Sequence, residues 1–144
     1  MIISAHLSQL DEIVSIENSS FEKPWTRNQI KGDIQANISS ENWVYTLDGK
    51  VVGYIFGWIF QNKFHLHNIA VHPDHLRKKI GKKLIKHIIL IVADQKVNVI
   101  LLEVSVNNIS TRKCYQSLGF VQTGIRKDYY SKGDDAILYN LEIN

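Results

Sequence analysis

The sequence has little cysteine and little proline. Its 144 residues include one cysteine, Cys114, and two prolines. A single cysteine excludes an internal disulfide and is typical of a reducing compartment, so we expect a cytoplasmic protein. Two prolines leave little room for a disordered linker, and the length suits one well-packed domain, which we expect to span residues 1–144.

Long apolar runs and a strong charge excess are also missing. The longest apolar run, IILIVA at 88–93, is far shorter than the about 20 residues that a membrane span needs. The N-terminus shows no signal-peptide pattern. The net charge of +3 is small for a dedicated nucleic-acid-binding protein, which neutralises many phosphates. We therefore expect no membrane or nucleic-acid partner, and a small polyanion fits better.

Hydrophobic periodicity is present and predicts the order βααβββαβαββ. The fold class is a mixed α/β domain, with a mostly antiparallel sheet and a central parallel βαβ unit. A Thr-x-x-Gln capping box at Thr26 begins a helix that we expect to run to about Ser39, and Asp48-Gly49 marks a hairpin. The predicted strands lie at 1–4, 43–60 (two), 63–71, 98–104, 120–130 and 136–143, and the predicted helices at 8–19, 26–39, 80–93 and 108–119.

One basic stretch, HPDHLRKKIGKKLI at 72–85, lies at the predicted junction of a strand and a helix. A helix N-terminus exposes unpaired N–H groups and carries partial positive charge, which favours phosphate. Gly81 would let a pyrophosphate approach the backbone closely. The alternative from this stretch alone is a solvated, lysine-rich helix face.

Other polar residues allow chemical and structural interpretations. Glu103 near the end of a buried strand predicts a carboxylate that faces a cleft, with a solvent-exposed strand end as the alternative. Tyr115 alone is typical of a core residue, and Cys114 is interpreted as packing. His65 and His67 share a strand face, but their spacing matches no common zinc pattern, so we expect no metal and assign His65 to a polar cleft.

Three segments together resemble the GCN5-related N-acetyltransferase family: NIAVHPDHLRKKIGKKLI at 68–85, LLEV at 101–104 and NNISTRKCYQSLGF at 107–120. The similarity runs nearly end to end. Within the family, the chain most resembles the ribosomal-protein alanine N-acetyltransferase branch, to which PWT at 24–26 and RKDYY at 126–130 are also similar.

The resemblance implies an enzyme that transfers the acetyl group of acetyl-CoA to the N-terminal α-amine of a protein, with a ribosomal protein as one candidate. It implies Glu103 as general base, Tyr115 as general acid, and His65 as a residue that helps to hold the catalytic water. The implied acceptor-binding residues are Trp25, Tyr129 and Tyr130. The implied cofactor-binding residues are Ile69, Ala70, Val71, Arg77, Lys78, Lys79, Ile80, Gly81, Lys82 and Asn108.

The basic loop departs from the family's Gln/Arg-x-x-Gly-x-Gly/Ala pattern at two positions. Leu76 replaces the Gln or Arg, and Lys79 replaces the first glycine. If that position needs φ > 0, Lys79 introduces about 1 kcal/mol of strain. If it does not, the Lys79 ammonium adds a positive charge near the phosphates.

Chemistry favours an α-amine as acceptor. With a pKa of about 7.7–8.0, an α-amine is roughly a tenth neutral at pH 7, against less than a thousandth for a lysine. Only the neutral amine attacks a thioester, and a carboxylate can remove the surplus proton through water. Two alternatives stay open: a small-molecule amine acetyltransferase of the same fold, and a non-catalytic module that binds CoA or nucleic acid.

Overall fold

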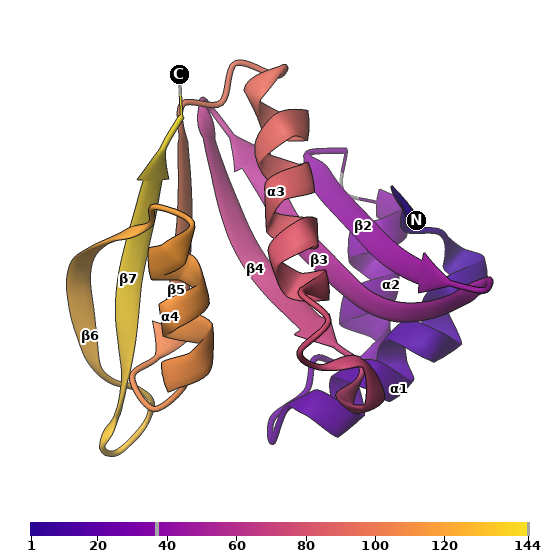
Figure 1. The fold of residues 1–144 in the computed structure, drawn as a ribbon, viewed down its shortest axis with the longest axis horizontal. Helices are drawn as coiled ribbons and strands as arrows, with labels where there is room; N and C mark the ends of the chain where they lie inside the picture. The colour runs from indigo at the N-terminus through magenta and orange to yellow at the C-terminus, as the bar shows by residue number, and fades with distance from the viewer. Residues whose placement is uncertain (37, 144) are drawn as a thin grey trace.

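One mixed sheet organises the molecule. The computed structural model describes residues 1–36 and 38–143. Within these residues a seven-stranded sheet has the order β1-β2-β3-β4-β5-β7-β6 (Figure 1). The strands are β1 (Ile2–Ser4), β2 (Ser40–Leu47), β3 (Lys50–Phe60), β4 (Lys63–Val71), β5 (Val99–Ser105), β6 (Val121–Ser131) and β7 (Asp134–Glu142).

Helices cover both faces of the sheet. They are α1 (Leu10–Ser20), α2 (Arg27–Ala36), α3 (Ile80–Ala93) and α4 (Ile109–Ser117), with short 3₁₀ helices η1 (Leu7–Gln9) and η2 (Pro73–His75). The α1 and α2 helices pack on one face, and α3 and α4 pack on the other (Figure 1). The predicted fold class and order of helices and strands are confirmed.

Two local sequence signals form as predicted. Gln29 N donates to Thr26 Oγ1 (3.2 Å) and Thr26 N donates to Gln29 Oε1 (2.7 Å), which closes the capping box of α2. Asp48 and Gly49 have φ of 51° and 78°, the left-handed pair that a tight hairpin requires.

Some predicted boundaries are wrong by a few residues. The α2 helix ends at Ala36, not near Ser39, and in its last turn the Asp33 carbonyl accepts a hydrogen bond from Asn42 Nδ2 on β2 (3.1 Å). Residue 37 lies outside the described residues. The predicted strand 98–104 runs over Val99–Ser105, so Glu103 lies two residues before its end. The predicted helix 108–119 spans Ile109–Ser117, and Gly119 (φ 97°) follows it.

The sheet parts between its two central parallel strands. In the described chain the pairing of β4 with β5 runs only from Lys63–Val99 to His65–Leu101 (Figure 1). Just beyond, the β3–β4 register shifts: Phe56 pairs with Asn68 but Gly57 pairs with Leu66, so His67 is an extra residue on β4. Such a bulge bends its strand. The bend turns β4 away from β5 and opens the sheet at this point.

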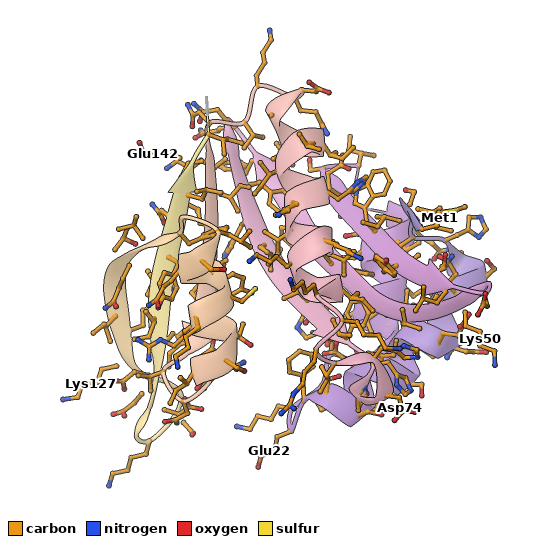
Figure 2. All side chains as sticks on the ribbon, viewed as in Figure 1. Met1, Glu22, Lys50, Asp74, Lys127 and Glu142 are labelled. Atoms are coloured by element: carbon orange, nitrogen blue, oxygen red, sulfur yellow. The ribbon has the colours of Figure 1, made fainter. Side chains whose placement is uncertain are left out.

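Two hydrophobic clusters stabilise the two faces of the sheet. The larger packs α3 and α4 on the sheet around Leu84, Ile88 and Ile100, and the smaller packs α1 and α2 around Ile13 and Ile30. The labelled side chains of Met1, Lys50, Asp74 and Lys127 lie at the periphery (Figure 2). Among the described residues, no helix is both long enough and apolar enough to cross a membrane.

Candidate active site

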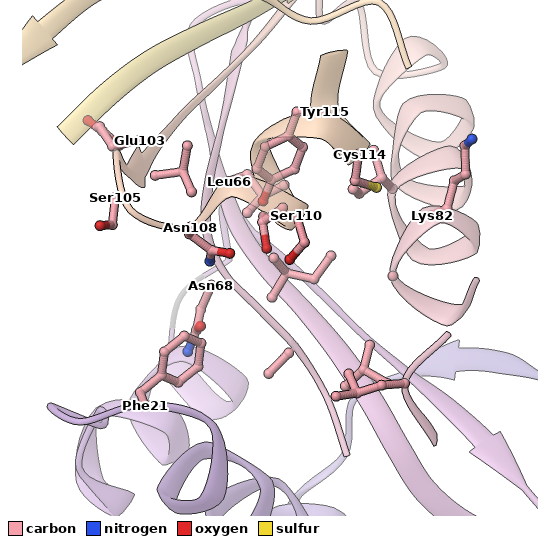
Figure 3. A pocket seen from close by; sticks show the side chains of 18 of the residues that line it. Phe21, Leu66, Asn68, Lys82, Glu103, Ser105, Asn108, Ser110, Cys114 and Tyr115 are labelled. Carbon is pink, nitrogen blue, oxygen red and sulfur yellow. The ribbon is translucent and has the colours of Figure 1, made fainter. Parts of the chain in front are cut away.

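A cavity of about 1040 Å³ occupies the place where β4 and β5 part. Its wall combines β4, the start of α3, β5, α4 and the loop after α1. Figure 3 shows Glu103 and Ser105 on β5, Tyr115 and Cys114 on α4, and Lys82 on α3. The volume lies at the upper end of the range for ligand pockets. An extended ligand can therefore reach from the basic loop to Glu103.

Glu103 and His65 form a hydrogen-bonded pair across the two central strands. His65 Nε2 lies 2.7 Å from Glu103 Oε2, and Arg126 Nη1 lies 4.0 Å from Oε1. The hydrogen bond from His65 is the main cause that lowers the pKa of Glu103, against burial, which raises it. Glu103 therefore carries its charge at neutral pH. It lines the cavity, whereas His65 lies outside the lining and contacts Glu103.

Tyr115 lies on α4 and lines the same cavity. It is 3% exposed, and its ring packs near Phe120 (5.4 Å between centroids) and Tyr139 (6.3 Å). Burial raises the pKa of Tyr115 well above its usual value. The phenol therefore keeps its proton throughout the physiological pH range. The neighbouring Cys114 packs partly on the core, as interpreted from the sequence, and also lines the cavity.

The N-terminus of α3 forms the basic end of the cavity. Lys79 is the N-cap of this 14-residue helix, with φ 61° and no hydrogen bond from its side chain to the helix. Arg77 is also left-handed, with φ 66°. The position where the family pattern has its first glycine therefore does need φ > 0, and Lys79 adopts this strained backbone conformation. Its side chain leaves the first N–H groups of the helix free to face a ligand.

Most of the predicted cofactor residues meet at this cavity. A Cβ added at Gly81 would come no closer than 3.8 Å to protein, at Val71 Cγ2, so close approach from the cavity is open. Lys78 does not line the cavity; its Nζ lies 3.1 Å from Nδ1 of His75. The lining includes the other nine predicted residues: Ile69, Ala70, Val71, Arg77, Lys79, Ile80, Gly81, Lys82 and Asn108.

Known proteins share this architecture. The model of the acetyltransferase (GNAT) family matches residues 10–120. The chain belongs to the GNAT family. A ribosomal protein bS18-alanine N-acetyltransferase of Escherichia coli K12 is 30% identical over 146 residues, which cover 99% of this chain and 97% of that protein.

Solved structures agree with the family assignment. The ribosomal-protein-S18-alanine N-acetyltransferase from Escherichia coli superposes with a TM-score of 0.92 at 28% identity, covering 100% of this chain and 94% of that chain. An aminoglycoside 6'-N-acetyltransferase complexed with coenzyme A gives a TM-score of 0.87 at 12% identity, covering 100% and 97%, and so shares the fold. This GNAT protein is an N-acetyltransferase, and acetyl-CoA is its cosubstrate.

Two of the three aromatic residues predicted to bind the acceptor line the cavity. They are Trp25 and Tyr130. Burial raises the pKa of Tyr130 to about 12, so this phenol is also protonated. Tyr129 does not line the cavity: it is 53% exposed and packs between Tyr130 and the Arg126 guanidinium. The rings of Tyr129 and Tyr130 contact each other (5.1 Å between centroids), and the β6–β7 register is irregular between Arg126 and Ser131.

His67 belongs to the site of this GNAT protein, although the sequence did not assign it a role. The bulge brings its ring to 4.4 Å from His65 and 4.6 Å from Trp58, with Trp25 at 6.4 Å. Burial lowers the pKa of His67 to about 4, so it is neutral at pH 7. Among the described residues, no group of three His, Cys, Asp or Glu residues can hold a metal ion.

Two further polar residues, Glu17 and Asn68, line the cavity without having been predicted. Glu17 on α1 and Asn68 on β4 are both buried, and they are hydrogen-bonded to each other. Glu17 lies on the same side of α1 as the apolar residues of that helix, so the helical periodicity predicts that its side chain is buried. Its partners, however, lie up to 51 residues away in sequence, so no local pattern indicates them.

Proposed function

We propose that this enzyme acetylates the N-terminal α-amine of a protein by direct attack on acetyl-CoA, with Glu103 as general base and Tyr115 as general acid. The observation that carries the proposal is the charged Glu103, hydrogen-bonded to His65, in one cavity with the protonated Tyr115. A ribosomal protein is the candidate acceptor, since the Escherichia coli relative is named for that activity.

Glu103 suits an acceptor that is already partly neutral. Its lowered pKa makes it a weak base, which supports removal of a proton from an α-amine better than from a lysine side chain. In the proposed step, the amine nitrogen attacks the thioester carbonyl, and the surplus proton passes through water to Glu103. His65 fixes the carboxylate and the position of that water.

Tyr115 suits the departure of the thiolate. Its phenol is protonated and buried in the wall of the cavity, so it can donate its proton or a hydrogen bond to the sulfur as the C–S bond breaks. Backbone N–H groups of β4 beyond the bulge, where β4 has left β5, can stabilise the oxyanion. Cys114 has no role in this scheme, because no acyl-enzyme forms.

The cavity walls would hold the two substrates at opposite ends. The N-terminal N–H groups of α3, with Gly81, Lys79 and Lys82, would bind the pyrophosphate of acetyl-CoA. Ile69, Ala70 and Val71 would present backbone groups to the pantetheine, and Asn108 would contact the cofactor near the start of α4. Trp25 and Tyr130 would line a slot for the first residue of the acceptor.

A paired peptide assay tests the proposal. One peptide begins with a free Ala and contains no lysine; the matched peptide is N-terminally blocked and carries one internal lysine. We expect acetylation of the first alone, measured by mass spectrometry. Acetylation of the blocked peptide at a comparable rate would contradict the α-amine assignment. Acetylation of neither peptide, with polyamines accepted, would favour the small-molecule alternative.

A further inference from the structure

Glu17 is a buried carboxylate at the acceptor end of the cavity that takes no part in the proposed chemistry. It lies on α1, is 1% exposed, and lines the cavity. Burying a carboxylate is unfavourable unless hydrogen bonds replace its water. Its position therefore depends on the donors that surround it.

Three donors from three separate segments converge on Glu17. The Trp25 backbone N–H donates to Oε2 at 2.8 Å, and Asn68 Nδ2 donates to Oε1 at 2.7 Å. The Tyr54 hydroxyl on β3 donates to the same Oε1. Bonds from neutral donors to a charged acceptor are about twice as strong as neutral ones. One side chain thus joins α1, β3, β4 and the loop over residues 21–26.

Two of these contacts lie at functionally important points. Asn68 is the residue directly after the bulged His67, where β4 leaves β5. Trp25 belongs to the 21–26 loop, from which Phe21, Glu22 and Lys23 also line the cavity (Figure 3 shows Phe21 beside α1). The Trp25 ring is 6.4 Å from the His67 ring. Glu17 therefore fixes the distance between the 21–26 loop and the bulged strand.

We propose that Glu17 is a positioning residue that holds the 21–26 loop in the conformation that binds the acceptor. This inference rests on the proposed function, since it assigns Trp25 to the acceptor slot. It predicts that loss of the carboxylate weakens use of the peptide acceptor and spares acetyl-CoA, which binds at the other end of the cavity.

Because of the chemistry of the three donors, two substitutions of Glu17 should have different effects. A backbone N–H cannot turn away, whereas the Asn68 amide can rotate to present its oxygen and the Tyr54 hydroxyl can reorient. Glu17→Gln can therefore keep its oxygen on the Trp25 N–H and donate to Asn68. Glu17→Met has a similar length and no strong acceptor, so it leaves the Trp25 N–H unpaired.

A matched control lies on the same helix. Glu12 Oε2 accepts the Val51 backbone N–H at 2.8 Å, a bond of the same kind made away from the 21–26 loop. Glu12→Met removes the same charge and the same type of hydrogen bond. It therefore measures how far the loss of one contact between α1 and a strand changes the kinetic constants when the 21–26 loop is not involved.

The experiment compares Michaelis constants for a peptide acceptor and for acetyl-CoA. We expect Glu17→Met to raise the peptide KM about tenfold or more. Its acetyl-CoA KM, and both constants of Glu12→Met, should stay within about twofold of the wild type. Glu17→Gln should rescue most of the peptide KM. An unchanged peptide KM in folded Glu17→Met would overturn the inference, as would equal effects on both substrates.

A measurement on the wild-type protein keeps the test independent of folding and of the acceptor. If Glu17 holds the loop, hydrogen exchange at the Trp25 amide is slow and stays slow in Glu12→Met; rapid exchange would refute the inference. If the wild type binds acetyl-CoA but acetylates no peptide, the proposed function fails. The Trp25 exchange rate then still decides whether Glu17 fixes the loop.

Discussion

At the scale of single residues, the titratable groups of the site differ in protonation state at neutral pH. Glu103 carries its charge because His65 holds it, while burial keeps the Tyr115 phenol protonated. The proposed base and acid are therefore both in the protonation states that the mechanism requires between about pH 5 and pH 9. The α-amine of the proposed acceptor titrates within that window, so we expect it to govern the pH dependence of the rate.

This difference in protonation state predicts the pH dependence of peptide acetylation. The kcat/KM should rise from pH 6 and level off above about pH 8, following the neutral fraction of an α-amine with a pKa of about 7.7–8.0. The lowered pKa of Glu103 places its own protonation below this range, so it adds no inflection there. Initial rates measured by mass spectrometry between pH 5.5 and 9.5 would give the profile.

Glu103→Gln should lower the plateau by about 10²-fold, a common loss for a general base, without moving the midpoint. Affinity for CoA, measured by calorimetry, should be unchanged because Glu103 is not part of the proposed pyrophosphate site at the N-terminus of α3. A midpoint that moves in Glu103→Gln would mean that Glu103 itself titrates in the profile. Unchanged turnover across the range would remove Glu103 from the mechanism.

At the scale of the elements, the bulge on β4 depends on a glycine in the neighbouring strand. A Cβ at Gly57 would lie 2.1 Å from Phe64 Cζ and 2.7 Å from the His65 carbonyl oxygen. Both contacts are far inside van der Waals distance, and one is with backbone. No rotamer change relieves the second contact, so β3 and β4 can approach this closely only with glycine at this position.

Gly57→Ala should therefore destabilise the protein strongly, by about 3 kcal/mol or more, or prevent folding. Gly32→Ala is the matched control. Gly32 lies in α2 with no heavy atom within 4 Å of the added Cβ, so its substitution should stabilise the helix by about 0.5–1 kcal/mol. Chemical denaturation of both variants measures the difference. A Gly57→Ala protein as stable as the wild type would show that the strands can move apart at the bulge.

The elements themselves were predictable where one local pattern governed them. The capping box at Thr26, the hairpin at Asp48-Gly49 and the apolar stripe of α3 each act within a few residues, and each formed as predicted. The bulge at His67 was not predictable, because it depends on the pairing of β4 with β3 and on the space that Gly57 leaves. Alternation along HLHN reads as an ordinary strand.

The residues of the site were likewise predictable only where a local sequence pattern indicates them. The family resemblance indicated Glu103, Tyr115 and most of the basic loop, since each of its three segments is a short run of consecutive residues. It assigned Lys78 to the cofactor and Tyr129 to the acceptor, but neither lines the cavity. Their side-chain directions depend on contacts that no motif shows: Lys78 with His75, and Tyr129 with Tyr130 and Arg126. The Glu17 network joins residues 8, 37 and 51 positions apart, so only the fold brings it together.

At the scale of the whole molecule, one cavity is lined by α1, β4, α3, β5 and α4, so a ligand bound there would contact several elements and should stabilise the folded state. Acetyl-CoA at about 100 times its Kd should add about 2.7 kcal/mol to the free energy of unfolding. Gly81→Asp should lose this gain, because a carboxylate would replace the open approach to the pyrophosphate with repulsion. Thermal unfolding with and without acetyl-CoA measures the effect.

A pair of lysine variants sharpens this test. Lys82 lines the cavity, whereas Lys78 does not. Lys82→Ala should reduce the stabilisation by acetyl-CoA, and Lys78→Ala should leave it nearly unchanged. Equal stabilisation of Gly81→Asp and the wild type would place the pyrophosphate elsewhere. A larger loss in Lys78→Ala than in Lys82→Ala would do the same.

The parting of β4 and β5 gives this sheet four edges instead of two. Besides the outer strands β1 and β6, the facing edges of β4 beyond His65 and of β5 beyond Leu101 lie inside the molecule without each other as partners. An open edge is a template for any extended chain, including an unfolded copy of the same protein. In the proposed complex, the cofactor and acceptor would cover these inner edges. We therefore expect acetyl-CoA to lower the tendency of the protein to aggregate as well as to support turnover.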